Sequence, residues 1–137
     1  MSTAERTLAE RIDAFLASAP VGVVGASTNP AKVGYRCLET LLAKGIAAIP
    51  VNPRATSILG SDAVADVADL PPEVGALNVI TPPPVTAAVL EVAIERGIRH
   101  VWIQPGAEEP RSIAQAIEAG LDVIHGGPCL LIALASR

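Results

Sequence analysis

Five short runs of aliphatic residues, separated by longer segments, constrain the fold of this chain more than any other feature of its sequence. The runs lie at 21–25, 46–51, 77–80, 98–103 and 121–124. Each run is apolar almost throughout, which is typical of strands that are buried on both faces of a parallel sheet. Since parallel strands are joined by crossovers, the sequence predicts an α/β fold: a doubly wound, Rossmann-like, five-stranded parallel sheet with helices on both faces. We expect the strand order 3-2-1-4-5.

Apolar residues at helical spacing occupy most of the segments around these runs. The first helix is predicted to begin at a capping box in residues 2–5 and to end before Pro20, with Leu8, Ile12 and Phe15 on its buried face. Further helices are predicted at 34–42, 85–93, 110–117 and 128–134. The segment 52–73 contains three prolines and is expected to be irregular.

The composition is typical of one cytoplasmic domain. The chain has 137 residues, so residues 1–137 are expected to form a single domain. Its 10 basic and 14 acidic side chains give a net charge of −4, which argues against a nucleic-acid binder. The apolar runs are too short for a membrane span, and the polar first residues lack the apolar core of a signal peptide. Two cysteines are too few for a disulfide framework or a Cys-rich zinc site.

The loops after the strands should carry the functional site, because ligands of open α/β sheets bind beyond the carboxyl ends of the strands. The first loop begins Gly25-Ala26-Ser27. The glycine lets backbone approach a ligand, and the N-terminus of the next helix attracts anions, so the loop predicts a phosphate site. It lacks the dinucleotide fingerprint, since Ser27 and Pro30 stand where the second and third glycines would be. A tight strand-to-helix turn capped by Ser27 is an equal alternative.

The second loop carries a guanidinium where NAD sites carry a carboxylate. It reads Asn52-Pro53-Arg54, whereas an NAD site holds the ribose hydroxyls with Asp or Glu in this region. Arg54 therefore favours a ligand whose adenosine ribose is phosphorylated, which means NADP or coenzyme A. A solvated loop arginine that contacts no ligand is the alternative for any single Arg.

The remaining loops complete the candidate site. Thr81 and Pro82 open a proline-rich turn that is rigid and presents a flat apolar wall, which suits one face of an adenine. Gln104 can donate and accept hydrogen bonds, and Gly106 permits close approach of the backbone to a ligand. The fifth loop, 125–129, is rich in glycine and lies on the same rim.

A series of motifs runs through nearly the whole chain and is fairly specific in its order and spacing. The motifs are Val21–Ser27, Gly34–Arg36, Ile49–Arg54, Ile58–Gly60, Trp102–Ala107 and Ala119–Leu121. Together they resemble the small bacterial and archaeal CoA-binding proteins. The single domain of those proteins is similar to the N-terminal CoA-binding domain of the succinyl-CoA synthetase α subunit.

The resemblance implies that coenzyme A or an acyl-CoA is the ligand, and it implies which residues contact it. Residues 25–27 would contact the CoA phosphates, and Lys32 lies in a loop that could close on them. Residues 52–54 would lie near the phosphorylated ribose and the adenine. Residues 81–82 and Gln104 would line the remaining cleft.

The chain departs from the family pattern in two places. Many family members carry an acidic-Phe-Arg pattern after the third strand, whereas this chain has Val79–Pro84, which is closer to the proline-rich loop of the synthetase domain. Many also carry Asp-Arg-Cys near the end, and of these only Cys129 is present, after Gly127 and Pro128. Roles that depend on the two missing arginines are therefore not carried over.

Three functions remain open, and the first is favoured. The first is a CoA-binding or regulatory module without chemistry of its own, because no set of nucleophile, base and orienting residue can be assembled, and His125 has no acidic partner in view. The second is an NADP-dependent oxidoreductase or another nucleotide-dependent enzyme, with which Arg54 is compatible. The third is a thiol-reactive role for Cys129, such as a mixed disulfide with CoA. Apolar residues on the first or last helix could form a homodimer.

Overall fold

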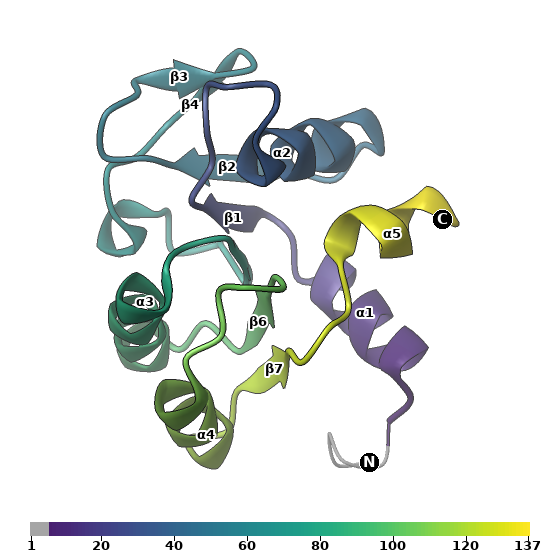
Figure 1. Ribbon diagram of the computed structural model, residues 1–137, viewed down its shortest axis with the longest axis vertical. Helices are drawn as coiled ribbons and strands as arrows, with labels where there is room; N and C mark the ends of the chain where they lie inside the picture. Colours follow the sequence, from purple (N-terminus) through teal and green to yellow (C-terminus); the bar gives the residue numbers. More distant parts are fainter. Residues whose placement is uncertain (1–5) are drawn as a thin grey trace.

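A parallel five-stranded sheet lies at the centre of the computed structural model, which describes residues 6–137 (Figure 1). Its strands, in spatial order, are β2 (Ala48–Val51), β1 (Val21–Val24), β5 (Ala76–Val79), β6 (His100–Ile103) and β7 (Asp122–Ile124). Neighbouring strands pair in parallel throughout. All five strands fall within or at the predicted aliphatic runs, and the predicted α/β class is confirmed.

The strand order differs from the one that we expected. The third parallel strand, β5, pairs with β1 instead of β2, so the order is 2-1-3-4-5 and not 3-2-1-4-5. The connection from β2 to β5 passes over β1 at Gly22. A Cβ atom at Gly22 would lie 2.8 Å from both the Leu70 Cδ1 and the Leu77 Cδ2 atoms, so the missing side chain makes room for this crossing. The crossing leads the chain to the far side of β1, where β5 begins.

Helices cover both faces of the sheet, as predicted. One face carries α1 (Leu8–Ala17), α2 (Val33–Ala43) and α5 (Leu130–Ala135), whose buried residues share one apolar core. The other face carries α3 (Pro83–Arg96) and α4 (Pro110–Glu118), whose buried residues join a second core. In the first core the rings of Phe15 and Trp102 meet edge to face at 5.4 Å, and the indole Nε1 of Trp102 donates a hydrogen bond of 2.9 Å to the Pro128 carbonyl.

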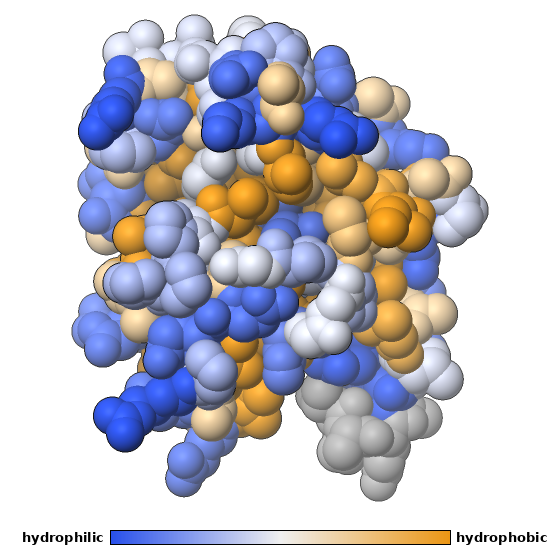
Figure 2. Space-filling model, in the orientation of Figure 1, coloured by the Kyte–Doolittle hydropathy of each residue, from blue (hydrophilic) through white to orange (hydrophobic). Residues whose placement is uncertain are grey.

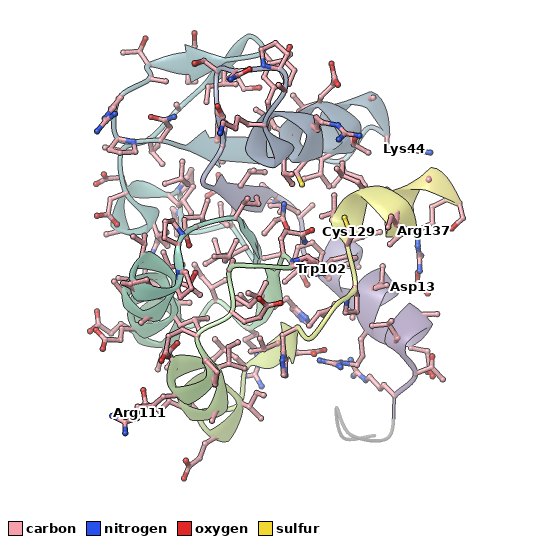
Figure 3. The ribbon with its side chains drawn as sticks, in the orientation of Figure 1. Asp13, Lys44, Trp102, Arg111, Cys129 and Arg137 are labelled. Carbon is pink, nitrogen blue, oxygen red and sulfur yellow. The ribbon has the colours of Figure 1, made fainter. Side chains whose placement is uncertain are left out.

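The two ends of the described chain lie on the same side of the sheet (Figure 1). The capping box predicted in residues 2–5 lies outside the described residues, and α1 instead begins with a capping box formed by Thr7 and Glu10. At the other end, Lys44 Nζ donates a hydrogen bond of 2.6 Å to the carbonyl of Arg137, and the Arg137 guanidinium pairs with Asp13 (Figure 3). Hydrophobic side chains gather on the surface over α5, where Ile132 is 75% exposed (Figure 2).

The segment that we expected to be irregular contains two small elements. Strands β3 (Ser57–Ile58) and β4 (Ser61–Asp62) form a hairpin, and η2 (Val67–Asp69) is a short 3₁₀ helix. Both central residues of the hairpin turn have positive φ, 53° at Leu59 and 77° at Gly60. Two-residue strands are too short to show a period of two, so the sequence pattern could not reveal them. In the described part of the chain, none of the helices has the length and apolar character to cross a membrane.

Candidate functional site

A cavity of about 410 Å³ lies at the carboxyl ends of β1, β2 and β5. Three loops predicted from the sequence, those after β1, β2 and β5, open onto it. Its walls are mainly apolar, and one of them is a face of α3. The lining residues are Val24, Gly25, Ala26, Val51, Asn52, Pro53, Ala65, Asp66, Val67, Thr81, Val85, Ala88, Val89 and Val92.

Two glycines let the loop after β1 pack between α2 and the start of the β5 loop. Gly25 has a φ of 95°, and a side chain there would collide with the carbonyl of Ile80. A Cβ atom at Gly34 would collide with the carbonyl oxygen of Gly25 and lie 3.1 Å from the Cα of Ala26. Gly34 therefore provides the close packing of helix on loop that the third glycine provides in a dinucleotide fingerprint. It lies too far along the chain to fit that fingerprint.

The rest of this loop is held by its own polar groups. The Ser27 hydroxyl accepts a hydrogen bond of 3.0 Å from the amide of Asn29, and the Asn29 carboxamide accepts one of 3.0 Å from the amide of Ala31. Lys32 is exposed and precedes α2, and its side chain does not cap the helix. The first-turn amides of α2 are therefore left to solvent or to an anion, which such helix ends attract.

Asn52 joins the loops after β1 and β2. Its Nδ2 donates a hydrogen bond of 2.9 Å to the carbonyl of Ala26, and its Oδ1 accepts bonds from the amides of Arg54, at 2.7 Å, and Ala55, at 3.0 Å. Asn52 and Pro53 line the cavity. The Arg54 side chain is exposed and is not among the lining residues, so it lies beside the cavity without forming its wall.

The loop after β5 is fixed by a buried threonine. The hydroxyls of Thr81 and Thr86 lie 2.7 Å apart, and Thr86 Oγ1 also donates toward the carbonyl of Thr81 at 3.3 Å. Thr81 lines the cavity, whereas Pro82 precedes α3 and is exposed. The threonine pair thus sets where α3 begins, and with it the position of the wall that α3 presents to the cavity.

Gln104 and Gly106 lie outside the cavity lining. Gln104 is 2% exposed, and its Nε2 donates a hydrogen bond of 2.8 Å to Asn78 Oδ1. Its Oε1 accepts a bond of 3.1 Å from the amide of Leu130. The carboxamide therefore links the end of β6 to β5 through Asn78 and to the start of α5 through Leu130. Gly106 is exposed with a φ of 94°, and its amide donates to the Glu108 carboxylate at 2.8 Å.

The structure also adds lining residues that we did not select from the sequence. The helical spacing of Val85, Ala88, Val89 and Val92 predicts an amphipathic helix, and in the structure these residues also line the cavity. Asp66 lies at the cavity because Val64, two residues before it, forms a parallel bridge with Val51 at the end of β2. No motif marks this position, so only the tertiary structure could identify it.

The two cysteines and His125 also lie away from the cavity lining. Cys37 is fully buried, and burial raises the pKa of its thiol to about 11 although the Asn78 side chain and Arg36 oppose the shift. Cys129 is half-buried and immediately precedes α5 (Figure 3). His125 lines a second cavity of about 350 Å³ beside α4. Within residues 6–137 there is no group of three or more side chains suited to hold a metal ion.

We expect the two thiols to differ in reactivity. A thiol reagent such as Ellman's reagent should modify one cysteine per native chain, Cys129, and two after unfolding, because Cys37 is inaccessible and largely protonated at neutral pH. Spectrophotometric titration measures this number directly. The Cys129→Ser variant should show no reactive thiol until it is unfolded, and rapid reaction of Cys37 in the native variant would contradict its burial.

The comparisons with known proteins match this architecture. The model of the CoA-binding domain family matches residues 20–135. This chain belongs to that family. The match includes all the loops that border the cavity and confirms the resemblance drawn from the sequence motifs.

Individual relatives of this CoA-binding domain are found both alone and within larger proteins. A conserved hypothetical protein of Pyrococcus furiosus is 36% identical, with a TM-score of 0.78 over 82% of this chain and 97% of its own. A dinucleotide-forming acetyl-coenzyme A synthetase of Ca. Korarchaeum cryptofilum is 28% identical, with a TM-score of 0.69 over 83% of this chain but 26% of the synthetase. The α subunit of an ADP-forming acetate–CoA ligase II of Pyrococcus furiosus is 28% identical over an alignment of 114 residues that covers 78% of this chain. The domain spans 25% of that subunit.

Proposed function

We propose that this domain binds coenzyme A or an acyl-CoA in the cavity at the carboxyl ends of β1, β2 and β5. The observation that carries the proposal is that an apolar cavity opens directly onto the glycine loop of β1. The walls suit the faces of an adenine, while the loop amides and the N-terminus of α2 suit phosphates. The cavity and the loop beside it can therefore together hold the base and the phosphates of a phosphorylated adenosine.

Except for Gly106, which lies outside the cavity lining, each predicted contact would have a role in this proposal. Gly25, Ala26 and Ser27 would approach the pyrophosphate with their backbone, and exposed Lys32 would add a positive charge. Asn52 and Pro53 would border the base and ribose. Arg54, Thr81 and Pro82 would lie at the rim. Gln104 would act by fixing β6 and α5, because its polar atoms are already bonded within the protein.

We propose further that the domain is a binding or regulatory module and performs no chemistry of its own. Of the described residues that line the cavity, only Asp66 is ionisable. His125 faces another cavity, and Cys129 is not part of the lining. A nucleophile, a general base and an orienting group would have to lie within hydrogen-bond reach of one another for acyl or group transfer.

The contribution of Arg54 can be measured with two ligands. Arg54→Ala should weaken CoA binding about tenfold, because it removes a charge-assisted bond to the ribose phosphate, and it should change the affinity for dephospho-CoA by less than about twofold. Arg111→Ala is the matched control, since Arg111 is exposed on α4, away from the cavity (Figure 3). An equal loss of affinity for CoA and for dephospho-CoA would contradict the proposed contact of Arg54 with the ribose phosphate.

Isothermal titration with CoA, dephospho-CoA, NAD and NADP tests the proposed function itself. We expect micromolar CoA binding, weaker binding of dephospho-CoA, and no binding of NAD or NADP. CoA at about 100 times its Kd should also add roughly 2.7 kcal/mol to the apparent stability, which a thermal shift detects. Tighter binding of NADP than of CoA would favour the oxidoreductase instead, and binding of none of the four would refute both functions.

A further inference from the structure

Asp66 is the one charged side chain among the described residues that line the apolar cavity. It stands directly before η2, on the segment that runs past the carboxyl end of β2. The sequence predicted that this region lacks a carboxylate and offers Arg54 instead. The tertiary structure thus brings a carboxylate to the cavity wall while the Arg54 guanidinium stays outside it.

The position of Asp66 is fixed on both sides along the chain. Before it, the amide of Asn52 donates to the carbonyl of Val64 at 2.9 Å, and the amide of Val64 donates to the carbonyl of Pro50 at 3.0 Å. After it, Val67 is buried, and its carbonyl accepts a hydrogen bond of 2.8 Å from Arg96 Nη1. The backbone that carries Asp66 is therefore held in place, and its exposed side chain borders the cavity from a fixed position, as selection between ligands requires.

Within residues 6–137, only one oxygen of the Asp66 carboxylate is hydrogen-bonded to the protein. Oδ1 accepts a hydrogen bond of 3.2 Å from the amide of Ala68 and so caps η2. Oδ2 makes no hydrogen bond within residues 6–137. An ionised carboxylate can only accept hydrogen bonds. Oδ2 can therefore accept a hydrogen bond from a donor on a ligand. Val85, Val89 and the other apolar lining residues would cover the faces of a flat ligand group, so the donor would lie on the edge of that group.

We propose that Asp66 selects the base of the bound nucleotide by accepting a hydrogen bond from the exocyclic amino group of adenine. This inference rests on the proposed CoA function, which supplies the adenine. The amino group is the hydrogen-bond donor on the edge of that flat ring. The ribose presents hydroxyls in several directions and fits an apolar slot poorly, so the base is the part of the ligand that matches these walls.

The test compares CoA with an analogue in which purine replaces adenine, so that only the amino group is lost. The wild-type protein should bind CoA about tenfold or more tightly than the purine analogue, because a charged acceptor loses its partner. Asp66→Asn is nearly isosteric, and with its Oδ1 capping η2 it presents an amide donor instead of an acceptor to the ligand. Asp66→Ser removes the carboxylate but keeps a hydroxyl that can cap η2. Both variants should bind the two ligands with affinities within about twofold of each other.

The role as a helix cap is separated from base selection by the purine analogue. In Asp66→Ser, the affinity for that analogue and the midpoint of thermal unfolding should stay near the wild-type values. A wild-type protein that binds CoA and the analogue equally, or variants that lose both ligands to the same extent, would overturn the inference and leave CoA binding intact. A wild-type protein that binds neither would overturn the proposed function, and the inference with it.

Discussion

Replacing Gly34 with alanine is expected to lower the free energy of unfolding by about 3 kcal/mol or more. The new methyl group would collide with the Gly25 carbonyl oxygen, while lying 3.0 Å from the Gly25 carbonyl carbon and 3.1 Å from the Ala26 Cα. These are backbone atoms, so no side chain can rotate away. The strain can be relieved only by moving α2 away from the loop after β1, and urea unfolding measures its cost.

Gly45→Ala is the matched control for this substitution. Gly45 follows α2 with a φ of 74°, and no atom lies within 4 Å of its hypothetical Cβ. The loss there should be about 1 kcal/mol, which is the cost of a left-handed conformation alone. If Gly34→Ala lowers the free energy of unfolding no more than Gly45→Ala does, α2 does not pack closely on the loop after β1. Where Gly34→Ala still folds, CoA binding should also weaken, because the displaced loop carries the proposed phosphate contacts.

Ala88→Glu should weaken CoA binding about 100-fold while leaving the fold intact. Ala88 lies on α3, is exposed, and lines the cavity. Glutamate is a good helix former, so the free energy of unfolding should change by less than about 0.5 kcal/mol. In the cavity, however, its side chain would occupy the proposed place of the adenine and would have to be desolvated when a ligand enters. Its charge would also repel the phosphates.

Ala114→Glu provides the same substitution at the other cavity. Ala114 is exposed on α4 and lines the cavity of about 350 Å³ beside His125. We expect its affinity for CoA to stay within about twofold of the wild-type value by isothermal titration. The opposite result, with Ala114→Glu impaired and Ala88→Glu normal, would move the binding site to the α4 face.

The layered α/β architecture of this protein follows from local patterns in its sequence. Runs such as 21–25 and 77–80 are apolar on successive residues, which only strands covered on both faces tolerate, and the spacing of Val85, Ala88 and Val89 is that of a helix. These signals are local, because they depend on the period of the backbone. For the same reason the loops after the strands could be named as candidates before their geometry was known.

Contacts between residues far apart in the chain decided the rest. The place of β5 beside β1 depends on Leu70 passing over Gly22, and the presence of Asp66 in the cavity depends on the bridge between Val51 and Val64. The sequence shows the carboxamide of Gln104 but not whether it bonds to a ligand or to the protein. In the structure it is buried and donates to Asn78, so it stabilises the protein interior. Sequence spacing does not encode such contacts, because they arise only when the whole chain packs and each polar group finds its partner.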